Sequence, residues 1–185
     1  MQPIQRGPYQ VISTRDVYHN RWIRVREDKV IHPGGQEGVF GVVEMKAGSS
    51  VLALTENDEV YLVSEYKYGI GRDSVELMSG GLEEAETPIE AAKRELKEEL
   101  GLEATEWIEL GVVDPFTTII HSPNYLFLAL GVKEGSNSPD EGEILKLMKV
   151  PLPRAIEMVM NSMITHSASC VLILKAAKYL QERKK

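Results

Sequence analysis

A helix with clearly written ends is the feature of this sequence that most constrains the fold. Thr87 can cap the helix, Pro88 suits the first helical position, and Glu90 stands three residues after Thr87. That spacing makes a capping box with proline at its first turn. Gly101 can end the helix in a left-handed conformation. The sequence therefore predicts a helix between Thr87 and Gly101.

The two faces of this helix differ in chemistry. Apolar residues recur every four positions and predict the side that packs on the core: Ala92, Leu96 and Leu100. Glu95, Glu98 and Glu99 recur at i, i+3 and i+4, which places them together on a face away from that stripe. Like charges repel, so either water screens them on a bland surface or a cation lies among them. Mg²⁺ and Mn²⁺ prefer oxygen ligands of this kind.

Composition limits the classes of function. The 185-residue chain suits one domain, with room for an appended arm, and its net charge of −7 argues against a general affinity for nucleic acid. A polyanionic substrate would need a local cation. The single cysteine, Cys170, is expected to be buried and inert; it excludes an intramolecular disulfide and a cysteine-based zinc site. No apolar run approaches the roughly 20 residues of a membrane span, and residues 1–10 lack a secretory core, so we expect a cytoplasmic protein without membrane contact.

The order of predicted elements favours mixed α/β packing, of the α+β kind, over a regular βαβ array. Residues 9–31 are rich in strand formers, and a turn is expected at residues 32–35. Residues 51–54 and 60–65 are expected to pair as a hairpin turned by residues 56–59. Further strands are expected at residues 39–45, 75–78, 107–113, 125–132 and 144–150, helices at 154–162 and 167–183, and loops at 69–73, 114–124 and 133–142.

The segment around the helix resembles the signature of a known family. Nine positions match the Nudix box: Gly80, Glu86, Arg94, Glu95, Leu96, Glu98, Glu99, Gly101 and Leu102. The resemblance implies the Nudix fold, a mixed β-sheet sandwiched between helices, over residues 46–185. It also implies an N-terminal β arm over residues 1–45 that forms a homodimer.

The same resemblance assigns roles inside the box. Glu95, Glu98 and Glu99 would bind the divalent metal, Mg²⁺ or Mn²⁺, with the carbonyl oxygen of Ser79 joining them. The remaining box residues would be structural: Gly80, Glu86, Arg94 and Gly101. Arg94 stands eight residues after Glu86 and can bridge back to it, and no fixed counter-charge is evident within the three metal-binding glutamates.

The residues before the box indicate a subfamily. Val75–Gly80, VELMSG, is similar to the ELPAG segment of ADP-ribose and nucleoside diphosphate sugar pyrophosphatases, although Met78-Ser79 replaces Pro-Ala. The implied activity is metal-dependent hydrolysis of the diphosphate linkage, giving a nucleoside monophosphate and a sugar phosphate. Two alternatives stay open: hydrolysis of nucleoside triphosphates or dinucleoside polyphosphates, and a nucleotide-sugar sensor that has lost catalysis.

Catalysis would also need a group that takes the proton of the attacking water. In this subfamily an acidic loop often supplies it, which here points to Glu141 first and Glu143 second, beside Glu98 of the box. The alternative is that both are solvated charges, because loops of this composition are common.

Substrate contacts are expected outside the box. Trp22 would stack on the base and Arg24 would meet phosphate or ribose, although a half-buried strand tryptophan and edge-strand solubility explain them as well. By resemblance, Lys67, which replaces the usual arginine, and Arg72 would face the substrate, and Glu76 would contact ribose or support other groups.

Overall fold

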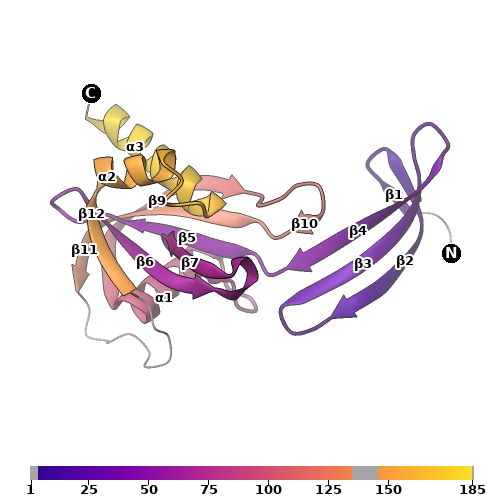
Figure 1. Ribbon diagram of the computed structural model, residues 1–185, viewed down its shortest axis with the longest axis horizontal. Helices are drawn as coiled ribbons and strands as arrows, with labels where there is room; N and C mark the ends of the chain where they lie inside the picture. Colours follow the sequence, from indigo (N-terminus) through magenta and orange to yellow (C-terminus); the bar gives the residue numbers. More distant parts are fainter. Residues whose placement is uncertain (1–3, 135–145, 185) are drawn as a thin grey trace. The chain divides into compact units, whose positions relative to one another are not determined.

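The computed structural model describes residues 4–134 and 146–184, and the chain divides into two compact units (Figure 1). The smaller unit contains the chain up to Lys46 together with residues 114–123. The larger unit contains residues 47–113 and the chain from Asn124 onward. A segment from the middle of the sequence is thus part of the same unit as the N-terminal strands.

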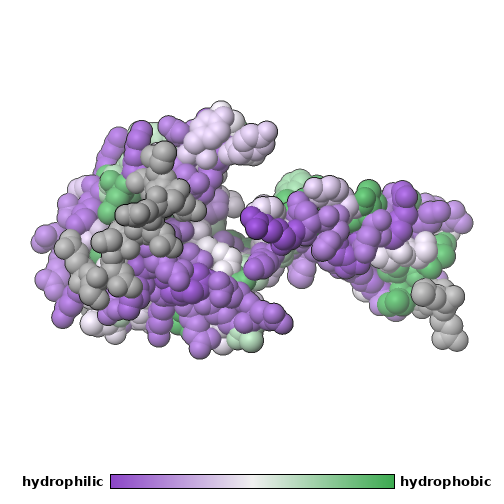
Figure 2. Space-filling model, turned by 90° about the horizontal axis from the view of Figure 1, so that it is seen from below, coloured by the Kyte–Doolittle hydropathy of each residue, from purple (hydrophilic) through white to green (hydrophobic). Residues whose placement is uncertain are grey.

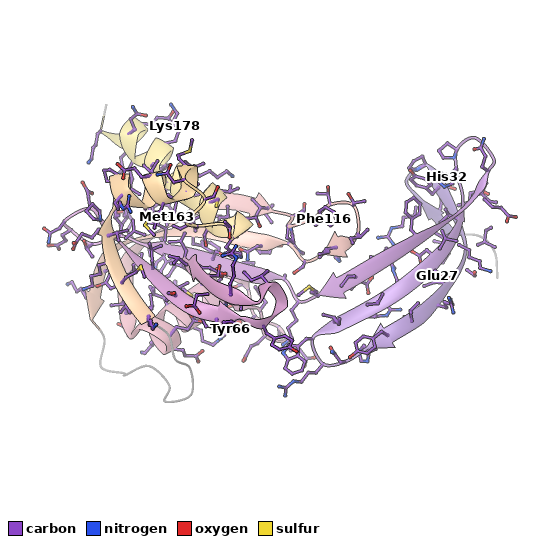
Figure 3. All side chains as sticks on the ribbon, in the orientation of Figure 1. Glu27, His32, Tyr66, Phe116, Met163 and Lys178 are labelled. Carbon is purple, nitrogen blue, oxygen red and sulfur yellow. The ribbon has the colours of Figure 1, made fainter. Side chains whose placement is uncertain are left out.

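The smaller unit is built on one sheet with the strand order β1-β2-β3-β4-β10. Its strands are β1 (Ile4–Arg6), β2 (Tyr9–His19), β3 (Ile23–Ile31), β4 (Glu37–Met45) and β10 (Ile120–His121). β10 runs parallel to β4, and the other neighbours are antiparallel. The predicted turn joins β3 to β4: the amide of Gly35, at a φ of +86°, donates to the carbonyl of His32 over 2.8 Å. The ring of His32, labelled in Figure 3, meets that of Tyr9 edge-on at 5.3 Å.

The larger unit contains two sheets. One has the order β8-β5-β11-β9 and the other the order β12-β6-β7. The strands of the first are β5 (Gly48–Ala53), β8 (Met78–Gly81), β9 (Leu102–Val113) and β11 (Asn124–Glu134). Those of the second are β6 (Glu59–Lys67), β7 (Arg72–Glu76) and β12 (Lys146–Pro151), with a short 3₁₀ helix, η1 (Tyr68–Ile70), between β6 and β7.

The predicted hairpin of residues 51–54 and 60–65 is wrong. β5 uses one edge for β8 and the other for β11, so neither edge is left for β6. β6 instead pairs with β12 and β7. The only strand-type pairing between these two described segments is an isolated bridge between Leu54 and Val60 at the turn. The turn itself forms where the sequence predicts it, with the amide of Thr55 donating to the carbonyl of Glu59 over 2.9 Å.

Helices cover both sides of the sheets, as the mixed α/β prediction requires. They are α1 (Pro88–Leu100), α2 (Leu152–Met160) and α3 (Ser167–Arg183). Alternate residues of β5 face opposite sides: Val51 packs in the cluster of α1 and Leu52 in that of α2 and α3. A strand buried on both faces reads as a continuous apolar run, which is what residues 51–54 show. Figure 1 shows α1 on the side opposite to α2 and α3.

Seen from below Figure 1, the surface of the larger unit is mostly hydrophilic (Figure 2). The predicted apolar stripe of α1 is buried against the sheets: Ala92, Leu96 and Leu100. Among the residues described, every helix falls short of the length and apolarity that a bilayer crossing requires.

Several element ends differ from the prediction. β9 begins at Leu102 rather than residue 107, because it pairs with the whole of β11. The expected loop of residues 114–124 contains β10, and β7 begins at Arg72, inside the expected loop of residues 69–73. Cys170 is partly exposed rather than buried, and its thiol donates to the carbonyl of Ile164 over 3.3 Å.

Candidate active site

The start of α1 is fixed as its sequence predicts. The side chain of Thr87 and the backbone of Glu90 form one half of the capping box, and the amide of Thr87 donates to the Glu90 carboxylate over 2.9 Å to form the other. Gly101 ends the helix with a φ of 63°, a left-handed conformation. The hydroxyl of Ser49 in β5 donates to the carbonyl of Pro88 over 2.7 Å and ties the helix start to the sheet. The orientation of the helix is therefore set at both ends.

One guanidinium group joins the acidic side chains of α1. Arg94 donates from Nε and Nη2 to both oxygens of Glu86, over 2.9 and 3.0 Å. Its Nη1 donates to Glu95 over 2.8 Å and to Glu98 over 2.9 Å, and Nη2 also reaches the carbonyl of Gly81 over 3.0 Å. The expectation that no fixed counter-charge lies among the three glutamates is therefore wrong, because Arg94 supplies one.

The charges in this cluster shift one another's pKa values. The hydrogen bond from Arg94 lowers the pKa of Glu86 and, in return, Glu86 raises the pKa of Arg94 above its ordinary value. Burial raises the pKa of Glu95 despite its bond to Arg94. The Glu95 side chain is 13% exposed and that of Glu98 is 53% exposed. Of the three carboxylates that Arg94 joins, Glu86 and Glu95 are therefore shielded and Glu98 is open.

The backbone of β8 lies directly against Glu95. A Cβ atom at Gly80 would meet the carboxyl carbon of Glu95 at 1.9 Å and its Oε1 at 2.0 Å, so any larger residue there must displace the Glu95 side chain. The next residue back, Ser79, pairs with Ser50 of β5, and the two hydroxyl oxygens lie 2.7 Å apart. The glycine of the box, Gly80, thus makes room for the side chain of Glu95.

The donor set fits a divalent cation by its chemistry. Glu95, Glu98 and Glu99 offer only carboxylate oxygens, which Mg²⁺ and Mn²⁺ prefer, and the absent Cβ of Gly80 leaves the space in which Glu95 lies. Within residues 4–134 and 146–184, however, no three acidic, histidine or cysteine side chains converge as a metal site, and Arg94 forms ion pairs with Glu95 and Glu98.

A second group of charged residues lies on the face of sheet β12-β6-β7 that also packs on α1. Lys67 of β6 stands opposite Arg72 of β7, and Glu65 lies two residues before Lys67 on the same face. Glu76, 13% exposed, ends β7 on that face. Burial alone would lower the pKa of Lys67, but the hydrogen bond to Glu65 and the charges of Glu76, Glu65 and Glu99 together raise it. The lysine thereby connects β6 and β7 electrostatically to the acidic face of α1.

Arg72 of this group also donates to the hydroxyl of Thr165 over 2.9 Å. The remaining predicted site residues lie elsewhere. In the smaller unit, Trp22 is 61% exposed with the Arg21 guanidinium 3.7 Å from its ring centre, and Arg24 binds Asp16 and Glu44. Glu141 and Glu143 lie outside the described residues.

Sequence reasoning missed His166 and Ser169. His166 Nδ1 lies 2.8 Å from the hydroxyl oxygen of Ser169 and 3.5 Å from Glu76. Ser169, fully buried, accepts the amide hydrogen of Leu77 over 2.9 Å. The only signal in the sequence is the position of His166 just before the helix predicted at residues 167–183.

Comparisons with known proteins show which families this chain resembles. The NUDIX domain matches residues 45–165, and the nucleoside diphosphate sugar hydrolase N-terminal domain matches residues 9–43. The chain is 29% identical to the methanol dehydrogenase activator of Bacillus methanolicus, covering 93% of this chain and 92% of that one. It is 26% identical to the ADP-ribose pyrophosphatase of Bacillus subtilis, covering 95% and 97%. A solved ADP compounds hydrolase superposes with a TM-score of 0.82 at 20% identity, over 99% of this chain and 96% of that one, which supports the fold.

Proposed function

The chain belongs to the NUDIX family, and we propose that it hydrolyses the diphosphate linkage of ADP-ribose or of a nucleoside diphosphate sugar. The products are a nucleoside monophosphate and a sugar phosphate. The observation that carries the proposal is the acidic cluster of α1, in which Gly80 makes room for Glu95 and Arg94 gathers Glu95 and Glu98. Enzymes of this family need a divalent cation, and we propose Mg²⁺ or Mn²⁺.

Glu95, Glu98 and Glu99 would hold that cation, together with the carbonyl oxygen of Ser79. When bound, the cation neutralises phosphate oxygens and activates water. The net charge of −7 otherwise repels a diphosphate. Arg94 has a structural role. Its ion pair with Glu86 fixes the loop before α1, and its ion pairs with Glu95 and Glu98 orient these two proposed metal ligands.

The remaining proposed residues bind the substrate. Lys67 and Arg72 lie opposite each other on one face, where two cations would meet the diphosphate. Glu76, at the end of β7, would accept hydrogen bonds from sugar hydroxyls. Trp22 would stack on the base and Arg24 would meet phosphate or ribose. These last two come from the smaller unit.

The proposed reaction forms one phosphorus–oxygen bond and breaks another. The oxygen of water forms a bond to one phosphorus, and the bond from that phosphorus to the bridging oxygen breaks. The water's proton passes to a carboxylate, for which we propose Glu141 or Glu143, and the bridging oxygen leaves with the other phosphate. We also propose that the enzyme is a homodimer formed by the N-terminal arm, and that it works in the cytoplasm, a reducing compartment that suits its single cysteine.

A substrate panel tests the function directly. ADP-ribose, nucleoside diphosphate sugars, nucleoside triphosphates and dinucleoside polyphosphates are incubated with Mg²⁺ or with a chelator, and products are separated by anion-exchange chromatography. We expect AMP and ribose 5-phosphate from ADP-ribose, with Mg²⁺ only. Glu98→Gln should abolish turnover. Glu84→Gln, a change at an exposed carboxylate in the same acidic segment, should not. Turnover of ADP-ribose by Glu98→Gln at the wild-type rate contradicts the proposal.

A second candidate rests on the similarity to the methanol dehydrogenase activator, which covers nearly the whole of both chains. On this reading the chain stimulates a dehydrogenase. Purified methanol dehydrogenase is assayed with NAD and methanol, with and without this chain. A rate increase that Glu98→Gln also gives would favour a binding role, and a rate increase lost in that variant would tie stimulation to hydrolysis.

A further inference from the structure

The start of α3 is tied to the backbone just before the box. Leu77, which joins β7 to β8, donates its amide hydrogen to the hydroxyl oxygen of Ser169 over 2.9 Å. His166 Nδ1 lies 2.8 Å from that same oxygen. The preceding residue, Thr165, accepts from Arg72 over 2.9 Å. The start of α3, which follows the segment marked by Met163 in Figure 3, is therefore attached to Arg72 at the beginning of β7 and to Leu77 just after its end.

The contacts of His166 indicate which ring nitrogen carries the proton. Nδ1 faces the Ser169 hydroxyl oxygen and, at 3.5 Å, a carboxylate oxygen of Glu76. If Ser169 donated its hydrogen to Nδ1, the lone pair on Nδ1 would face the negative charge of Glu76. A proton on Nδ1 avoids this repulsion, because Ser169 can accept it and it then lies near the Glu76 carboxylate. The tautomer with the proton on Nδ1 is therefore the one that suits Glu76.

The Glu76 side chain is 13% exposed. Its charge also acts on Lys67 of β6, which is hydrogen-bonded to Glu65 and attracted by Glu99. Without the donor at His166, Lys67 becomes the main attraction for Glu76. The carboxylate would turn toward the lysine, and both groups would be drawn away from a bound substrate.

We propose that His166 is a positioning residue: with Ser169, it holds the Glu76 carboxylate in the orientation that binds the sugar of the substrate. This rests on the proposed function, in which Glu76 contacts the sugar. Because His166 acts only through Glu76, its loss should weaken substrate binding while leaving the chemical step and the metal site unchanged.

The experiment is a double-mutant cycle in steady-state hydrolysis of ADP-ribose. His166→Phe keeps the ring volume and removes both the hydrogen bond to Ser169 and the 3.5 Å contact with Glu76, and we expect KM to rise about tenfold, with kcat within about twofold. His166→Asn, whose amide can donate from the place of Nδ1, should restore most of the wild-type KM. In the background of Glu76→Gln, His166→Phe should add less than about twofold.

The outcomes separate the two ideas. A wild type that hydrolyses none of the panel defeats the proposed function itself. A wild type with normal turnover but additive effects of His166→Phe and Glu76→Gln overturns the role of His166 alone, as does a loss confined to kcat. Mn²⁺ affinity, measured by electron paramagnetic resonance, should be the same in all variants, and a large change in it would likewise overturn the proposal. If His166→Phe does not fold, Ser169→Ala replaces it in the cycle, with the same expectations.

Discussion

Gly80→Ala is the smallest change that tests the geometry of the acidic cluster. The new methyl carbon would lie 1.9 Å from the carboxyl carbon of Glu95 and 2.4 Å from its Cγ. The backbone itself tolerates alanine, because Gly80 has no positive φ. The substitution therefore acts by displacing the glutamate, and it leaves the local chain conformation alone.

The size of the displacement follows from these distances. Ordinary contact begins near 3.4 Å, so the carboxyl group must withdraw by roughly 1.5 Å. A shift of that size breaks the 2.8 Å bond between Arg94 and Glu95 and removes Glu95 from a common metal position. Misplacing a catalytic group by about 1 Å typically costs on the order of a hundredfold in rate. We expect a loss of that order in kcat/KM, together with a Mn²⁺ affinity weakened about 10- to 100-fold.

The assay follows ADP-ribose hydrolysis as a function of Mn²⁺ concentration, with binding measured in parallel by calorimetry. Gly69→Ala is the matched control, since nothing lies within 4 Å of a Cβ at Gly69 and its φ is not positive. The control should behave as wild type. If Gly80→Ala kept both wild-type Mn²⁺ affinity and wild-type turnover, the argument that this glycine makes room for a metal ligand would fail.

Other changes test the fold and its charges. Leu96→Ala should lower the free energy of unfolding by about 2–5 kcal/mol, because it leaves a cavity at a fully buried position. Thr87→Ala should lower it by only about 1 kcal/mol, because it removes the helix cap. Urea denaturation measures both changes. The hydrogen bond from Arg94 lowers the pKa of Glu86 below 4.5 in the folded chain. At acid pH the unfolded chain therefore binds more protons than the folded chain. The stabilisation of the fold by this pair is complete above pH 4.5 and is lost as the pH falls through the lower pKa of the folded state. Arg94→Gln should therefore lose stability less steeply than wild type between about pH 5 and pH 3, and equal slopes would contradict this.

Local patterns predicted the parts of this protein that local chemistry decides. The capping box, the glycine at the end of α1 and its buried apolar stripe all depend on residues within a few positions of one another. The same holds for the carboxylate spacing that led to the Nudix box. The pairing of β5 was not predicted, because one edge of β5 pairs with β11, which is distant in sequence. No local pattern in the sequence indicates that pairing.

The candidate site shows the same limit. The contact between Arg94 and Glu86 was expected from their spacing, but the reach of Arg94 to Glu95 and Glu98 depends on side-chain orientation. The sequence did not predict His166 as a site residue, because Glu76 is far away along the chain and only the packing of α3 brings the two side chains together.

In the proposed function, the acidic face of α1 holds the divalent cation. Anomalous diffraction from a crystal soaked with Mn²⁺ would locate the ion. We expect a peak within coordination distance of carboxylate oxygens of Glu95, Glu98 and Glu99, with Arg94 withdrawn from at least one of them and still bound to Glu86. A Mn²⁺ peak at other residues, with Arg94 still bridging Glu95 and Glu98, would contradict it.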